Sequence, residues 1–168
     1  MAIVCSLAPS VAAAAPAIRP GAVEIGISGA VTIVEGGARG GAAVDGGIFL
    51  CAPGGLAYGG LEVAYAHISS LDNLDLGAHV AWTRAVGATS LYPFVALAGA
   101  VRQEWIGSFA ETRYPVGVDL GVRALVASSV NVRFHYRIRR VLGDPVADFT
   151  EQELRFGIAL LLRNAPAR

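Results

Sequence analysis

The feature that most constrains this chain is a period-two alternation that returns along its whole length. In residues 21–34, GAVEIGISGAVTIV, one set of alternate residues is almost entirely valine and isoleucine, and the other holds Glu24 with small or weakly polar residues. Such alternation is typical of a β-strand with two different faces, because successive side chains point to opposite sides. The same pattern recurs at residues 42–51, 57–67, 73–84, 91–104, 115–126, 129–141 and 151–163.

The length of these segments favours a membrane-spanning barrel. Each holds about ten residues or more, which matches the ~9–11 residues of a tilted transmembrane strand and exceeds the ~5–6 usual in soluble sheets. The connections at one end are short, whereas those at 35–41, 105–114 and 142–150 are longer, a pattern typical of outer-membrane barrels. We therefore predict an all-β fold, an eight-stranded antiparallel up-and-down transmembrane β-barrel, with both termini on the periplasmic side.

The polar face of the strands is predicted to line the interior. It mixes charged residues with glycine and alanine, as in a narrow tube where small residues leave room for arginines to meet carboxylates. Eight strands enclose only enough space for side chains, so these charges are interpreted as an ion-pair plug and not as a channel. The predicted luminal residues are Glu24, Asp45, Glu62, Asp75, His79, Arg102, Glu104, Asp119, Arg123, Arg133, His135, Arg137, Glu153 and Arg155.

A soluble, lipocalin-like ligand-binding barrel is the inverse alternative, with the apolar face inside. Against it stand the absence of lysine and a charged fraction of only 15%. Aromatic residues near the segment ends also suit the interfacial girdles of a membrane barrel. They are Tyr65, Trp82, Tyr92, Trp105 and Tyr114.

The two ends of the chain point to export. Residues 1–17, MAIVCSLAPSVAAAAPA, have the apolar stretch and small-residue end of a secretory signal, although no basic segment precedes them. We predict that the barrel domain spans residues 18–164 and that residues 165–168 form a short tail.

The last predicted strand carries a family resemblance. RFGIALLL, residues 155–162, is similar to the C-terminal assembly signal of outer-membrane barrels at Arg155, Gly157, Leu160 and Leu162, with Leu162 where an aromatic residue is usual. Together with the eight segments, the chain resembles small outer-membrane barrels of the OmpA and OmpX type. The resemblance implies a Gram-negative outer-membrane location and the outer-membrane assembly machinery as a partner during biogenesis.

A second resemblance is shorter. Some eight-stranded outer-membrane enzymes deacylate lipid A with a His-x-Ser pair and a nearby carboxylate, and His67, Ser69 and Asp72 have this composition. In those enzymes the pair lies in a late strand, whereas here it follows the third. The simpler interpretation is an interfacial histidine beside a loop serine, so we predict no catalytic site and keep a lipid-A-modifying hydrolase as the alternative.

The remaining charges exclude several function classes. The net charge is zero, which argues against nucleic-acid binding. No His/Cys cluster suits a metal, and no glycine motif suits a nucleotide, so no cofactor is expected. Arg113 and Arg140 are predicted to contact lipopolysaccharide phosphates at the outer rim. The predicted role is structural, in the cell envelope, or one of surface interaction, with no oligomeric state indicated.

Overall fold

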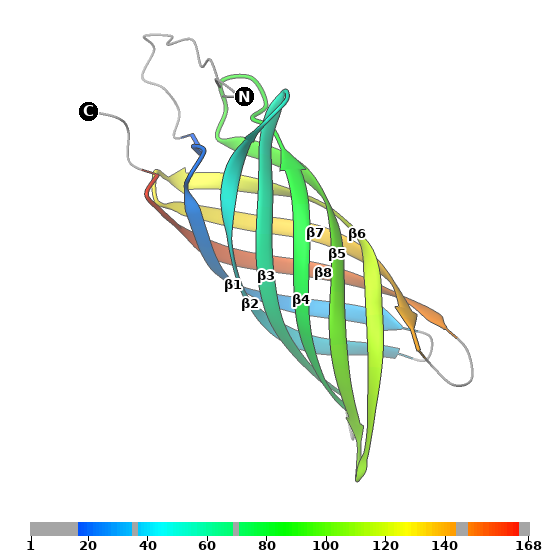
Figure 1. Cartoon of the computed structure of the whole chain (residues 1–168). Coiled ribbons are helices and arrows are strands. Elements are labelled where there is room, and N and C mark those ends of the chain that lie inside the picture. Colours follow the sequence, from blue (N-terminus) through cyan, green and yellow to red (C-terminus); the bar gives the residue numbers. More distant parts are fainter. Residues whose placement is uncertain (1–16, 35–36, 69–70, 144–147, 165–168) are drawn as a thin grey trace.

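Eight strands close into one barrel in a computed structural model that describes residues 17–34, 37–68, 71–143 and 148–164 (Figure 1). Each strand pairs antiparallel with the next, and the last pairs back with the first, which confirms the predicted fold. The described residues include no helix long and apolar enough to cross a membrane. The strands are β1 (Val23–Val34), β2 (Gly37–Ala52), β3 (Gly55–Ile68), β4 (Leu71–Thr83), β5 (Leu91–Ile106), β6 (Phe109–Ala127), β7 (Val130–Leu142) and β8 (Phe149–Leu162).

The first and last described residues lie at the same end of the barrel, which we call the terminal end. The Asn164 amide fixes them there, since it donates to the carbonyl oxygens of Ala17 at 3.1 Å and Ser128 at 2.7 Å. Its oxygen accepts the backbone N–H of Arg19 at 3.0 Å. The opposite, distal end carries the turn between β5 and β6, and this hairpin projects beyond its neighbours (Figure 1).

The predicted contrast between short turns and long loops is wrong for two of the three expected loops, and the third, at 142–150, lies partly outside the described residues. Strand β2 already begins at Gly37 and β6 at Phe109, so most of the expected loops at 35–41 and 105–114 are strand. The cause is that alternation continues through them, with Arg39 and Arg113 facing inward. The longest described connection, residues 84–90, lies at the terminal end.

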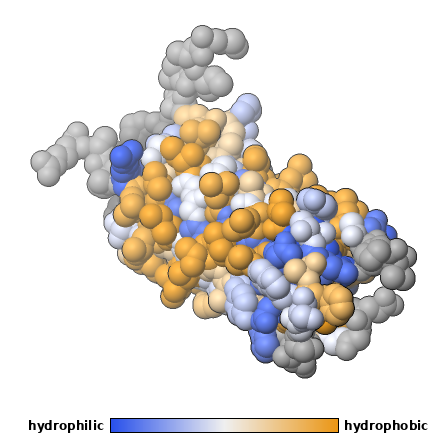
Figure 2. Space-filling view, turned by 60° about the horizontal axis from the view of Figure 1, so that its bottom comes forward, coloured by the Kyte–Doolittle hydropathy of each residue, from blue (hydrophilic) through white to orange (hydrophobic). Residues whose placement is uncertain are grey.

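The wall of the barrel is apolar on the outside. Leu61 and Leu97, near the middle of their strands, are 70% and 69% exposed, and thirty-one further large apolar side chains are also exposed. Figure 2 shows apolar side chains over the wall and hydrophilic ones gathered toward the ends. Such a surface suits lipid contact, so the soluble, inside-out alternative is wrong.

Four of the five aromatic residues expected at the membrane interfaces do face outward: Tyr65, Trp82, Trp105 and Tyr114. The fifth, Tyr92, was assigned wrongly, because it points into the barrel and is only 3% exposed. There its hydroxyl accepts the backbone N–H of Ile18 at 2.9 Å. The terminal segment therefore seals this end of the barrel against an inward-facing aromatic ring.

Candidate functional site

The interior has an apolar part at the terminal end and a charged part beyond it. Phe49, Tyr58 and Phe94 lie in the apolar part, and the Arg123 guanidinium lies 5.4, 4.8 and 4.3 Å from their ring centroids, respectively. Such cation–π contacts stabilise a cation whose hydration has been removed. Arg123 thus forms the boundary between the two parts. The buried apolar cluster consists of Ile18, Ala22, Phe49, Leu56, Tyr58, Ala81, Tyr92, Phe94, Ala96, Leu125 and Leu161.

The first charged group above this boundary is centred on Arg133 of β7. Its guanidinium donates two hydrogen bonds to Asp45, at 2.6 and 2.7 Å, and a third to Glu24 at 3.1 Å. The other oxygen of Glu24 accepts from the Asn131 amide at 2.7 Å. Fork-shaped pairing of this kind is the strongest that arginine makes with a carboxylate.

A second group is centred on Arg137, which lies four residues beyond Arg133 in β7 and shares its inward face. Arg137 binds Asp119 through two hydrogen bonds of 2.6 and 2.8 Å and reaches Glu62 across the barrel at 2.9 Å. Arg155 of β8 also donates to Glu62, at 2.5 Å, and to Glu153. Four different strands are thereby joined through the lumen.

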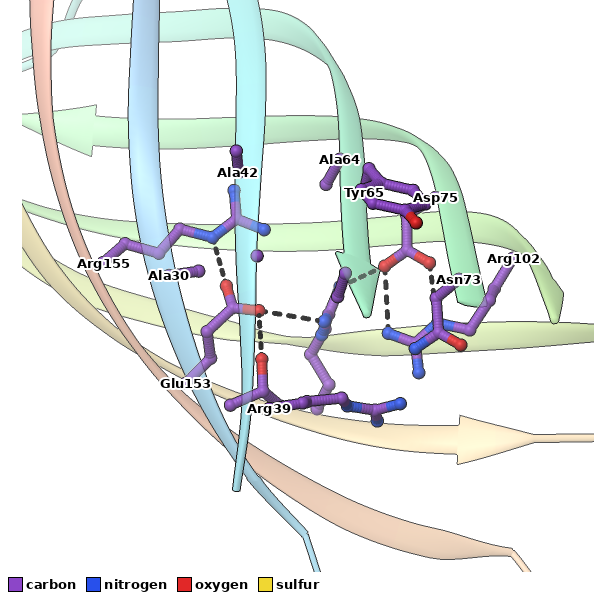
Figure 3. Close-up of a pocket in the computed structure, with 14 residues that line it drawn as sticks. Ala30, Arg39, Ala42, Ala64, Tyr65, Asn73, Asp75, Arg102, Glu153 and Arg155 are labelled. Carbon is purple, nitrogen blue, oxygen red and sulfur yellow. Dashed lines mark hydrogen bonds and ion pairs between the residues drawn. The ribbon is translucent and has the colours of Figure 1, made fainter. Parts of the chain in front are cut away.

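The third group lies closer to the distal end and contains three arginines and two carboxylates. Arg102 binds Asp75 at 2.6 and 2.9 Å and Glu151 at 2.9 and 2.8 Å. Glu151 also forms ion pairs with Arg39 at 2.6 Å and with Arg139 at 2.5 Å. In Figure 3, Arg39, Arg102 and Arg155 reach into the same space, which Asp75 and Glu153 line.

Arg113 lies in the lumen, and its predicted contact with lipopolysaccharide at the rim is wrong. Its side chain binds Glu104 at 2.7 Å and Glu111 at 2.8 Å, and the residue is 8% exposed. The residues around it have the polar composition of a loop, although they belong to β6. Within the strand, Arg113 shares the inward parity of Asp119.

The structure places every predicted luminal residue on the inner face. The two histidines lie among aromatic rings: His79 stacks on Tyr58, and His135 meets Phe94 edge-on. Arg39 and Glu151 also face the lumen and were not predicted to do so, although continued alternation was the signal for both. Arg139 faces the lumen as well, as the alternation of residues 129–141 predicts. With these three residues and Arg113, the buried charges of the described residues number eight arginines and eight carboxylates.

These side chains leave little space inside. The cavities found among the described luminal residues measure about 20, 10 and 20 Å³. Each is close to the volume that one water occupies, so none connects the two ends of the barrel.

The remaining predicted residues lie on β3, β4, β7 and β8. His67 Nδ1 lies 2.8 Å from Asp72 Oδ1 on the outer surface near the distal end, whereas Ser69 falls outside the described residues. Arg140 faces outward, with Thr150 at 3.5 Å. Of the assembly-signal residues, Arg155 and Gly157 face the lumen, and Leu160 and Leu162 face outward. The signal-like segment up to residue 16 and the tail also fall outside the described residues.

Comparison with known proteins supports the fold. No protein-family model matches the chain, and neither does any curated protein. Among solved structures it is similar to Neisserial surface protein A, with a TM-score of 0.61 and 14% identity over 83% of this chain and 95% of that one. It is also similar to Ail, the attachment invasion locus protein of Yersinia pestis, with a TM-score of 0.53 and 10% identity over 86% of this chain and 100% of that one.

A third similar structure is the outer membrane enzyme PagL, with a TM-score of 0.53 and 12% identity over 80% of this chain and 97% of that one. The predicted resemblance to small eight-stranded outer-membrane barrels is thus confirmed at the level of the fold. An apolar exterior and a charged interior agree with that fold, which is that of a transmembrane barrel of the bacterial outer membrane.

Proposed function

We propose that this chain is a closed outer-membrane barrel with a structural role in the cell envelope. The observation that carries the proposal is the filled lumen, in which eight arginines and eight carboxylates are buried together. Several strands are held together by these pairs in addition to the ladder hydrogen bonds. A barrel filled in this way is a rigid body that holds the turns of its distal end at the membrane. It opens no path for ions.

Planar-bilayer recording tests the absence of a path. The purified full chain is expected to give no regular conductance steps, because the luminal cavities are no larger than single waters. A variant in which Arg102, Asp75 and Glu151 are all replaced by alanine serves as the comparison, since it removes three of the five charged side chains of the third group from the lumen. Steady steps from the unmodified chain would refute the closed barrel.

A surface-interaction role is supported by the projecting β5–β6 hairpin. Phe109 at its tip is 77% exposed, the highest value among the exposed large apolar residues of the described chain. The similar structure Ail, the attachment invasion locus protein of Yersinia pestis, has also been solved in complex with the heparin analogue sucrose octasulfate. Binding of this chain to host-cell surfaces, compared with a Phe109→Ser variant, tests the role.

Arg140 remains the proposed contact for lipopolysaccharide phosphates. It is exposed on the outward face of β7 toward the distal end. Binding of lipopolysaccharide to the reconstituted barrel is expected to weaken in Arg140→Ala and to stay unchanged in Arg84→Ala, a matched exposed arginine near the terminal end. Equal binding by both variants would remove Arg140 from the interface.

A lipid-modifying hydrolase is the second candidate function, and one contact favours it. His67 and Asp72 lie 2.8 Å apart, the arrangement in which a carboxylate orients a catalytic histidine. Release of fatty acid from lipid A by the purified chain, lost in Ser69→Ala, is the required result. A chain that releases none is no hydrolase of this class.

A further inference from the structure

The outer wall contains a hollow over β8, β1, β2 and β3. This groove has a volume of about 680 Å³, and its lining is almost entirely apolar. Most of the outer wall carries large apolar side chains, so a concave stretch in it needs a local cause.

The strand register supplies the cause. Gly29 of β1 pairs with Ala42 of β2, and these two small residues form the floor of the groove. Gly29 pairs on its other side with Phe156, and Ala42 pairs with Tyr65, so one aromatic ring stands on each side of the floor. The row nearer the terminal end has larger residues, Ile158, Ile27, Val44 and Val63.

The groove leads to a polar cluster at its distal end. In the next row Gly40 pairs with His67, and His67 pairs with Asp72. Asp72 Oδ1 accepts the Tyr65 hydroxyl at 2.5 Å and lies 2.8 Å from His67 Nδ1. The side chains of His67 and Asp72 are 54% and 40% exposed, so both present polar atoms to the surroundings.

A second hollow on the same wall differs from the groove in having no polar side chains on its outward rim. It measures about 450 Å³ and lies over Gly46 and Gly59, nearer the terminal end. Its outward rim is Val23, Ile25, Ile48 and Leu61, and none of these has a polar side chain. Only the first groove joins an apolar floor to hydrogen-bonding groups.

We propose that the groove binds one acylated lipid, with an acyl chain along Gly29 and Ala42 and the headgroup at His67 and Asp72. A bilayer surrounds this wall, so a hydrocarbon chain is the occupant that fits the floor between two aromatic rings. The Asp72 carboxylate accepts hydrogen bonds, and the headgroup it selects therefore carries an N–H or O–H. The occupant we propose is phosphatidylethanolamine, because its ammonium offers that donor and its positive charge complements the Asp72 carboxylate.

The proposal concerns binding and requires no lipid cleavage. It rests on the proposed function only in that the barrel lies in the membrane. Its contacts are independent of Arg140 and of the luminal ion pairs.

Photo-crosslinking tests the groove in the full chain. The barrel is placed in phosphatidylcholine nanodiscs with a trace of phosphatidylethanolamine that carries a diazirine in its acyl chain, and lipid A with the same group is used in parallel. We expect labelling concentrated on β1, β2 and β3, with the higher yield from the phosphatidylethanolamine probe. A higher yield from the lipid A probe would overturn the choice of headgroup. Labelling spread evenly around the barrel with both probes would overturn the proposal.

Matched variants separate the two halves of the site. A Cβ built on Gly29 or on Gly59 meets no atom within 4 Å, so a side chain can begin at either position without a clash. Gly29→Leu is expected to lower groove labelling about tenfold, which corresponds to the loss of roughly two buried methylenes, whereas Gly59→Leu leaves it unchanged. Unchanged labelling in Gly29→Leu would overturn the chain site.

The headgroup contact has its own readout. In the His67→Ala/Asp72→Asn double variant, the preferred probe is expected to lose its advantage over a diazirine phosphatidylcholine of the same chain length. A preference that survives both substitutions would overturn the headgroup site. The shift in gel mobility between boiled and unboiled samples shows that each variant is folded.

Discussion

At the scale of single residues, Arg137 holds together charges that cannot be exposed without unfolding the barrel. It joins Asp119 and Glu62, which lie on different strands and are both buried. Removing one partner of a buried ion pair leaves an uncompensated charge and costs about 3–5 kcal/mol. We therefore expect Arg137→Ala to lower the free energy of unfolding by that amount, measured by urea unfolding in detergent micelles.

The control for this prediction is an arginine whose side chain is exposed to water. Arg84→Ala, exposed near the terminal end, is expected to change the unfolding free energy by no more than about 0.5 kcal/mol. Arg137→Lys is expected to fall between the two, because an ammonium cannot form the two parallel bonds of a guanidinium. Equal effects at positions 84 and 137 would show that the luminal pairs contribute nothing specific.

Gly117 limits how closely two strands approach each other. A Cβ at this inward position would lie 2.1 Å from the carbonyl oxygen of Ile138, which is backbone and cannot move aside cheaply. Gly117→Ala is therefore expected to abolish the heat-modifiable band. At the outward Gly99, the nearest atom to such a Cβ is 3.8 Å away, so Gly99→Ala is expected to fold. Normal folding of Gly117→Ala would contradict this packing.

At the scale of strands and hairpins, depth in the membrane decides what an exposed apolar residue does. Leu97, midway along β5, and Phe109, at the distal turn, are 69% and 77% exposed. Arginine on the lipid face costs about 2–4 kcal/mol at the bilayer midplane and nearly nothing near the interface. Leu97→Arg is thus expected to impair folding into lipid vesicles, whereas Phe109→Arg folds normally. Equal yields would place β5 outside the bilayer.

The strands were predictable from the sequence and their ends were not. Alternation sets the parity of each residue, which is why Glu24, Arg102 and Arg137 were assigned to the lumen. Glycines around Arg39 and polar residues around Arg113 have the composition of loops, and this composition hid the extension of β2 and β6. The partners were also hidden, because the contact between Arg137 and Glu62, 75 residues apart, depends on how the barrel closes.

At the scale of the whole molecule, the barrel has an apolar outer wall and an interior filled by ion-paired side chains whose charges cancel. Eight buried arginines balance eight buried carboxylates, so folding leaves no net charge in the lumen. Such balance lets a membrane protein keep charged residues without contact to lipid. The shell faces lipid, whereas the described interior holds cavities of only about 10 to 20 Å³.

The salt dependence of stability tests this closed interior. Raising the salt concentration from about 0.05 M to 1 M shortens the screening length severalfold, to roughly 3 Å, for charges that ions can approach. The luminal pairs lie in a lumen with cavities of about 10 to 20 Å³, too small to admit hydrated ions. We therefore expect the urea midpoint of the full chain to stay nearly constant over this range. The triple alanine variant at Arg102, Asp75 and Glu151 provides the comparison, since its enlarged lumen admits ions to the remaining pairs and its midpoint is expected to fall with salt. A steep decrease for the unmodified chain would mean that the lumen exchanges ions with the solvent.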